Sequence, residues 1–148
     1  MIYDDKFLND YATRIKKIYV SNIKKSNNFT LSFSLFCGLI AVIDTDIRNK
    51  IFSKIQLPKY INPNTNKLSD KDNKNKTISI MRHFRNSLCH FKIDGTQFIS
   101  DNQKNIKAIL FIDKDFYSNE KNFECCLSIT EFNSFFNFIL NTIIASGK

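Results

Sequence analysis

Apolar residues recur along the chain at two different spacings, which separate helical from extended segments. The three- to four-residue spacing of one helical face runs through residues 7–19, 30–52, 78–88 and 132–144. The segment 30–52 is apolar nearly all round as far as Ile43 and one-sided afterwards, so we expect one long helix in the middle of a bundle. The pattern as a whole predicts four helices.

Capping signals mark where two of these helices begin. Asp4 or Asp5 can cap the first helix through a side-chain oxygen. Before the last helix, Ser128 and Glu131 have the spacing of a capping box, in which each side chain bonds to the backbone N–H of the other residue. The sequence therefore predicts a last helix that begins close to residue 129.

The third helix should begin between Asp70 and Thr77, after a loop over residues 56–76 that holds both prolines and several asparagines. Its apolar side chains fall within an arc of about 160°, because each residue turns the helix by about 100°. We expect this arc to face the core. The residues in it are Ile78, Ile80, Met81, Phe84 and Leu88.

Past residue 90 the spacing becomes that of short β-strands. Apolar runs at 91–93, 98–99 and 106–112 are separated by an Asp94-Gly95 turn and a polar loop. Over 123–129, apolar residues alternate with polar ones, the period of a half-buried strand. We therefore expect a mostly α fold with a small antiparallel β appendage between the third and last helices.

Length and charge limit the classes of protein further. The 148 residues suffice for one core, and neither flank of the loop at 56–76 could form its own, so we expect a single domain over 1–148. Lysine and arginine number 22 against 14 acidic residues, which gives a net charge of +8. Such a charge attracts polyanions such as RNA or DNA.

The cysteines and the N-terminus suggest a compartment. Four cysteines, at 37, 89, 125 and 126, form no disulfide framework, which favours a reducing compartment. Strand alternation should bury one sulfur of the pair 125–126 and expose the other. The first residues lack a secretory pattern, so we expect a cytoplasmic protein.

The uncharged segment 26–43 has too short an apolar part for the ~20 residues of a membrane helix. A buried helix is the preferred interpretation, and membrane association is a third alternative.

The polar side of the third helix carries the candidate chemistry. Outside the apolar arc lie Arg82, Asn86, Cys89 and His90, with Arg85 at the border. Arginine offers a planar fork for phosphate oxygens, and histidine exchanges a proton near neutral pH. RNA supplies its own nucleophile in the 2′-hydroxyl, so a base, an acid and a cation suffice for its cleavage. The alternative is a solvated helix face whose histidine only stabilises the helix dipole.

Other kinds of site find little support. Cys89 stands beside His90, but no second cluster of ligands has the spacing of a zinc site. The three glycines stand alone, which excludes a glycine-rich phosphate loop. We therefore expect neither a metal nor a cofactor.

The string from Met81 to His90 resembles the signature of the HEPN superfamily. That signature has an arginine, a polar residue, a few variable positions and a histidine, which Arg85, Asn86 and His90 match. Two long helices before the string, a β excursion after it and a last amphipathic helix are similar to small stand-alone bacterial HEPN proteins.

The resemblance implies a four-helix bundle that commonly dimerises and that, in many members, is a metal-independent endoribonuclease used as a toxin or in anti-phage defence. By position, His90 would be the catalytic acid or base, Arg85 would stabilise the scissile phosphate and Asn86 would orient groups in the site. Arg82 and His83 are candidates for further RNA contacts, although we expect His83 to be an ordinary surface residue.

Two hypotheses stay open at this point. The first is a homodimeric HEPN endoribonuclease acting on cellular RNA, with an antitoxin protein as a possible partner. Its dimer follows from spacing, because five residues leave Arg85 and His90 about 140° apart on an ideal helix, so a second chain could complete the site. The second is a non-catalytic HEPN module that binds nucleic acid or a protein.

Overall fold

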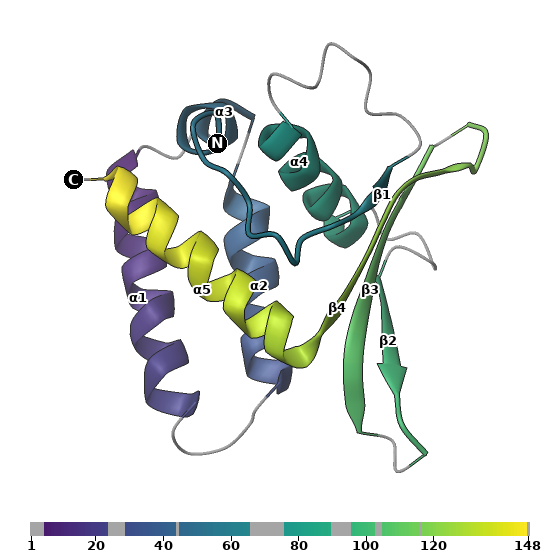
Figure 1. The fold of residues 1–148 in the computed structure, drawn as a ribbon. Coiled ribbons are helices and arrows are strands. Elements are labelled where there is room, and N and C mark those ends of the chain that lie inside the picture. The colour runs from purple at the N-terminus through teal and green to yellow at the C-terminus, as the bar shows by residue number, and fades with distance from the viewer. Residues whose placement is uncertain are drawn as a thin grey trace. The chain divides into compact units, whose positions relative to one another are not determined.

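The computed structural model describes residues 5–23, 29–43, 45–65, 76–89, 96–102, 105–115 and 117–147. Within these residues the chain is mostly helical, with five helices and a small antiparallel sheet placed before the last helix, which confirms the predicted fold class (Figure 1). The elements are α1 (Asp5–Ile23), α2 (Phe29–Val42), α3 (Thr45–Phe52), β1 (Asn64–Thr65), α4 (Lys76–Cys89), β2 (Thr96–Ser100), β3 (Ile106–Lys114), β4 (Lys121–Ser128) and α5 (Ile129–Ser146).

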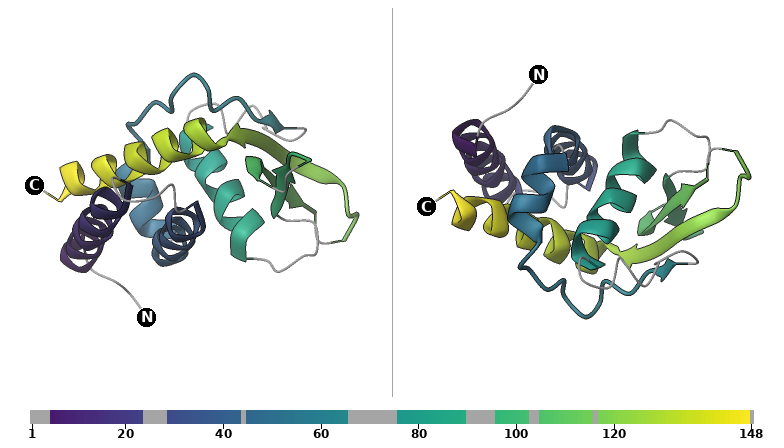
Figure 2. Two further views of the ribbon diagram at one scale, coloured as in Figure 1. Left: turned by 90° about the horizontal axis from the view of Figure 1, so that it is seen from below. Right: turned by 90° about the horizontal axis from the view of Figure 1, so that it is seen from above.

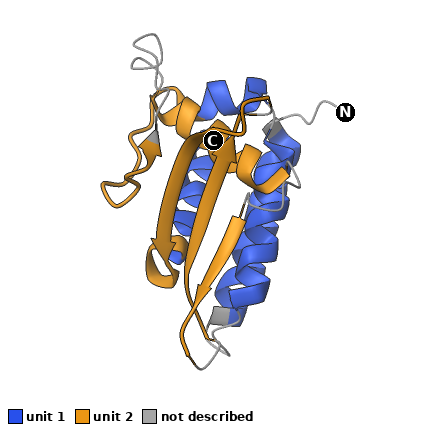
Figure 3. Ribbon diagram, turned by 90° about the vertical axis from the view of Figure 1, so that its right-hand side faces the viewer, with its two compact units in different colours: residues 1–51, 133–148 blue, residues 52–132 orange. Residues whose placement is uncertain are grey.

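The chain divides into two compact units (Figure 3). Unit 1 comprises residues 1–51 and 133–148, and unit 2 comprises residues 52–132. The single domain over 1–148 stays a prediction.

Unit 1 is built from α1, α2, α3 as far as Ile51 and the larger part of α5 (Figure 2). Aromatic rings pack together in its interior. Phe36 of α2 meets the rings of Phe135 and Phe136 at centroid distances of 6.1 and 5.7 Å. Tyr19 of α1 packs edge-on against Phe136 at 4.8 Å, and burial raises the pKa of its hydroxyl. The apolar stripe predicted for residues 132–144 is therefore the side of α5 that lies in the core.

The prediction of one helix over 30–52 is wrong, because α2 ends at Val42 and α3 begins at Thr45, with 103° between the two. Thr45 and Asp46 explain the new start, since their short polar side chains favour the first turn of a helix over its interior. Among the described residues, no single helix is both long and apolar enough to cross a membrane. The bent pair of α2 and α3 passes that test by length and composition.

Unit 2 holds α4 and an antiparallel sheet with strand order β1-β4-β3-β2. The strands β2 and β3 contain the runs predicted at 98–99 and 106–112, and β3 extends to Lys114. The alternating run predicted at 123–129 lies in β4 as far as Ser128, and Ile129 begins α5. The loop predicted over 56–76 contributes a two-residue strand, β1, which pairs with β4. The runs predicted at 91–95 lie outside the described residues.

The local signals at the helix starts are confirmed where the structure describes them. The side chain of Glu131 accepts hydrogen bonds from the backbone N–H of Ser128 at 2.9 Å and from its hydroxyl at 2.8 Å, while Glu131 N–H donates to Ser128 Oγ at 3.3 Å. These bonds lower the pKa of Glu131. At the other end of the chain, α1 begins at Asp5, and Asp4 lies outside the described residues.

Strand alternation also places the adjacent cysteines as predicted. Cys125 is buried and Cys126 is exposed, and both are free thiols. Burial, followed by the nearby Cys126 and Glu131, raises the pKa of Cys125 to about 12.

Candidate functional site

Helix α4 packs against β3 through a wider and more polar face than its apolar residues predict (Figure 1). Ile80, Met81 and Phe84 are buried as expected. The buried face also includes three polar residues, and its centre lies about 80° around the helix from the predicted centre. These polar residues are Ser79, His83 and Ser87. The displacement leaves Ile78 and Leu88 only half-buried.

The expected surface position of His83 is wrong, since only 7% of this residue is exposed. Its ring lies parallel to Phe123 of β4, with 5.1 Å between centroids and 12° between planes. Its Nδ1 atom is 2.8 Å from Oδ2 of Asp113 on β3. His83 can be buried because the Asp113 carboxylate gives its imidazole a hydrogen-bond partner in the interior. The spacing of apolar residues along the sequence contains no information about this partner.

Asn86 shares the same carboxylate oxygen. Its Nδ2 donates to Asp113 Oδ2 at 3.0 Å. Because a carboxylate only accepts hydrogen bonds, this contact assigns the amide orientation and turns Oδ1 of Asn86 away from Asp113. His83, Asn86 and Asp113 therefore form one hydrogen-bonded network, which we call the Asp113 network.

Sequence reasoning missed Asp113, although the strand pattern contains a signal for it. Successive side chains of a strand point to opposite faces, so Asp113 shares the face of Ile109 and Phe111. All three residues are buried. A carboxylate in an inward series of apolar residues is a buried charge that needs a partner.

The arginines of α4 lie outside this network. Arg82 is exposed and sits one turn before Asn86. Arg85 is half-buried, and its Nε atom is buried without a hydrogen-bond partner among the described residues. Around the helix, Arg85 lies about 160° from His83 and Arg82 about 100° from it. Of the five predicted site residues, the structure thus joins Asn86 and His83, and His90 lies outside the described residues.

Contacts along α4 hold its position in unit 2. At the start of the helix, Thr77 Oγ1 donates to the carbonyl oxygen of Ile55 at 2.6 Å. Near its end, Thr96 Oγ1 of β2 donates to the carbonyl oxygen of Ser87 at 3.0 Å. Between them, Phe84 is completely buried and meets two aromatic rings of the sheet edge-on. The helix is therefore anchored on both sides of His83 and Asn86.

The chain matches the family model HEPN pEK499 p136 over residues 1–148. It belongs to this HEPN family. No significant match was found among curated proteins or among solved structures. HEPN membership supports an RNase-like or nucleotide-binding module. Arg85 and Asn86, whose sequence pattern resembles the HEPN signature, lie near the end of α4.

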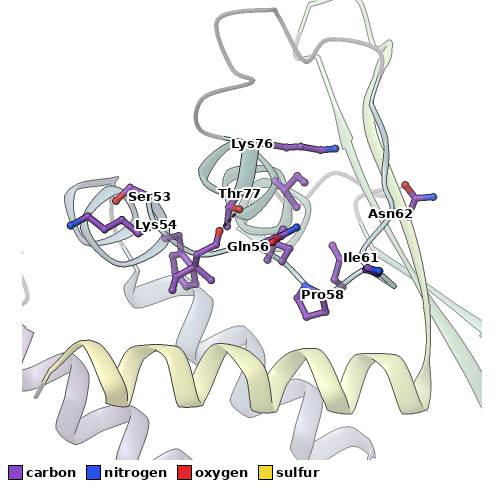
Figure 4. A pocket seen from close by; sticks show the side chains of 13 residues that line it. Ser53, Lys54, Gln56, Pro58, Ile61, Asn62, Lys76 and Thr77 are labelled. Atoms are coloured by element: carbon purple, nitrogen blue, oxygen red, sulfur yellow. Dashed lines mark hydrogen bonds between the residues drawn. The ribbon is translucent and has the colours of Figure 1, made fainter.

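The HEPN chain also contains a pocket of about 510 Å³ at the opposite end of α4 (Figure 4). Three lysines line it and no acidic residue does, although Lys54 points away from Gln56 and Pro58. The pocket is about 15 Å along the helix from Asn86. Its lining comprises Phe52, Ser53, Lys54, Ile55, Gln56, Leu57, Pro58, Lys59, Ile61, Asn62, Lys76, Thr77 and Ile80. Within the described residues, no group of three His, Cys, Asp or Glu side chains could hold a metal ion.

Proposed function

We propose that this HEPN chain is a metal-independent endoribonuclease that cleaves RNA through its own 2′-hydroxyl. The observation that carries the proposal is the state of Arg85, at the arginine position of the HEPN signature. Its Nε is buried and has no hydrogen-bond partner among the described residues. A buried donor without a partner is unfavourable, and a phosphate oxygen would satisfy it with a charge-assisted hydrogen bond.

In the proposed reaction, a base removes the proton of the 2′-hydroxyl and the oxygen attacks the adjacent phosphorus. The bond from phosphorus to the 5′-oxygen breaks, and an acid protonates that oxygen. His90 supplies a base or an acid, and Arg85 stabilises the charge that develops on the phosphorane. Asn86, held by Asp113, orients groups of the substrate. The net charge of +8 attracts the RNA.

The proposal extends to assembly and biological role. Because Arg85 and His90 are about 140° apart on an ideal helix, a second copy of the chain would bring an arginine and a histidine to one phosphate. We therefore propose a homodimer that acts in the cytoplasm as a toxin or anti-phage effector, with an antitoxin protein as a possible partner. Light scattering should report a dimer, and mixed dimers of Arg85→Ala and His90→Ala chains should recover activity.

The test is digestion of RNA by the purified protein in excess EDTA. The protein should cut RNA, leave DNA of the same sequence intact and produce 2′,3′-cyclic phosphate and 5′-hydroxyl ends. His90→Ala and Arg85→Ala should each slow the reaction by ~10²–10⁴-fold. Arg14→Ala is the matched control, because Arg14 is an exposed arginine on α1.

A strict need for Mg²⁺, or undiminished cutting by His90→Ala, would refute the ribonuclease mechanism. Binding of RNA without cleavage, weakening steeply as salt rises, would instead favour the non-catalytic nucleic-acid module. Flat binding between low and high salt would point to a protein partner.

A further inference from the structure

The pair of His83 and Asp113 lies outside the HEPN signature of Arg85, Asn86 and His90, yet it contains the groups that proton transfer needs. We propose that His83, oriented by Asp113, is a second acid–base residue of RNA cleavage, and that its Nε2 takes the proton of the 2′-hydroxyl. The inference rests on the ribonuclease activity proposed above.

The geometry leaves Nε2 as the reactive atom of His83. Asp113 as a carboxylate accepts the hydrogen bond of 2.8 Å, so the proton of the neutral imidazole resides on Nδ1 and the lone pair on Nε2. No hydrogen bond joins Nε2 to another described residue. The exposed part of the side chain amounts to 9%. A narrow opening to solvent at Nε2 would suffice for contact with one hydroxyl group.

The packing of α4 against the sheet does not require a polar pair at positions 83 and 113. Phe123 stacks on the ring of His83 and Phe84 contacts both Phe123 and Phe111, so apolar side chains would fill such a site equally well. Replacing both partners of a buried hydrogen bond by apolar groups of similar shape can be nearly neutral or stabilising. The reaction, by contrast, requires both a base and an acid. The chain has two histidines in all, and the other is His90.

The neighbours of His83 on α4 form a substrate-binding arc, and Arg85, which lies about 160° from His83 around the helix, would reach the same phosphate from the second copy of the proposed homodimer. Asn86 lies about 60° from His83 around the helix, and Arg82 lies about 40° beyond Asn86. Arg82 is exposed and makes no hydrogen bond or ion pair with another described residue, so its guanidinium can contact a phosphate. Asn86 Oδ1, which points away from Asp113, can accept a hydrogen bond from an amino group of a base, because the single proton of the 2′-hydroxyl goes to Nε2 of His83. The 2′-hydroxyl distinguishes RNA from DNA.

The step balances without a further reactant. The O–H bond of the 2′-hydroxyl breaks and its proton moves to Nε2 of His83, while the oxygen forms a bond to phosphorus. The bond from phosphorus to the 5′-oxygen breaks with its electron pair, and that oxygen takes a proton from the acid. His83 then returns its proton to solvent.

The sharpest test is His83→Asn. The Nδ2 of asparagine lies close to the place of Nδ1 of histidine, so the variant keeps a donor for Asp113 but has nothing in place of Nε2. We expect a folded protein that binds RNA with wild-type affinity and cleaves it ~10²–10⁴-fold more slowly in single turnover. Added imidazole should restore part of the rate to His83→Ala.

Two further variants separate chemistry from packing. Asp113→Asn should lower kcat with little change in KM, because Asp113 is a positioning residue that acts through His83 and Asn86. Ser79→Ala is the control and should cleave at the wild-type rate. Ser79 is buried on the same helix, and its Oγ has no hydrogen-bond partner among the described residues.

Full single-turnover activity of folded His83→Asn would overturn the inference while leaving the ribonuclease proposal intact. A wild-type protein that cuts no RNA would refute both. If the His83 variants fail to fold, NMR of His90→Ala decides. Because this variant cleaves RNA slowly and its RNA keeps the 2′-hydroxyl, bound RNA should shift the ring signals of His83. Unchanged ring signals in the bound state would overturn the inference.

Discussion

Removing the carboxylate of Asp113 alone should destabilise unit 2. In Asp113→Leu, the donors of His83 and Asn86 lose the oxygen that they contact at 2.8 and 3.0 Å. Each unsatisfied buried donor costs about 1–3 kcal/mol. Asn86 is only half-buried and can be hydrated, so we expect a total loss of about 2–4 kcal/mol. For a chain of this size, Tm should fall by about 4–16 °C.

Removing both members of the pair should restore that stability in full. In the double variant His83→Phe with Asp113→Leu, two apolar side chains would pack beside Phe84, Phe111 and Phe123. Replacing both partners of a buried hydrogen bond in this way can be nearly neutral or stabilising. We therefore expect the double variant to unfold at or above the wild-type Tm and to lose RNA cleavage.

The assay is urea unfolding followed by far-ultraviolet circular dichroism, with both single variants completing a double-mutant cycle. The decisive quantity is the coupling energy between the two positions. If the double variant is as unstable as Asp113→Leu, the pair itself stabilises the fold. That result would remove the reason for assigning His83 and Asp113 to chemistry.

Three further predictions concern stability and reactivity. Ser128→Ala should lose about 1 kcal/mol at neutral pH by urea unfolding. Because the pKa of Glu131 is lowered in the folded state, the stabilisation from its carboxylate is present above the unfolded pKa and is lost as pH falls through the folded pKa. The stability difference between Ser128→Ala and the wild-type protein should therefore shrink below a pH of about 4. A difference that stays constant with pH would contradict this. Alkylation of the native protein, read by mass spectrometry, should modify Cys126 and spare Cys125, whose pKa is raised to about 12 by burial; equal labelling would be inconsistent with the structure. Phe84→Ala should lower the free energy of unfolding by about 3–5 kcal/mol, and a loss below about 1 kcal/mol would contradict the packing of its ring between two others.

The elements that the sequence predicts well depend on local signals. The start of α5 follows from two residues three positions apart, Ser128 and Glu131, which bond to each other. The strand β4 follows from alternation within a few residues, and β2 and β3 follow from short apolar runs between turn signals. Likewise, the HEPN signature lies within residues 85–90, so Arg85 and Asn86 could be singled out without knowledge of the fold.

The features that the sequence pattern missed depend on partners far along the chain. His83 and Asp113 are 30 positions apart, and neither residue indicates the other by spacing. The strand β1 exists because residues 64–65 pair with 123–124 of β4. The break between α2 and α3 is a different case, because Thr45 and Asp46 were visible and the apolar residues on both sides outweighed them in the prediction. Asp113 was also visible as a carboxylate in an inward strand position.

The rotation of α4 connects the Asp113 network with the HEPN signature. Turning the helix by about 80° would bury Ile78 and Leu88, which are now half-buried, but it would move His83 and Asn86 away from Asp113. The observed orientation therefore gives up apolar burial for two hydrogen bonds to one carboxylate. Because Arg85 and Asn86 turn with the same helix, Asp113 also determines the direction in which both point. In an apolar double variant, α4 can adopt another rotation while the protein stays stable. Such a variant would lose RNA cleavage for two reasons, because Arg85 and Asn86 would point elsewhere and because His83 would be missing.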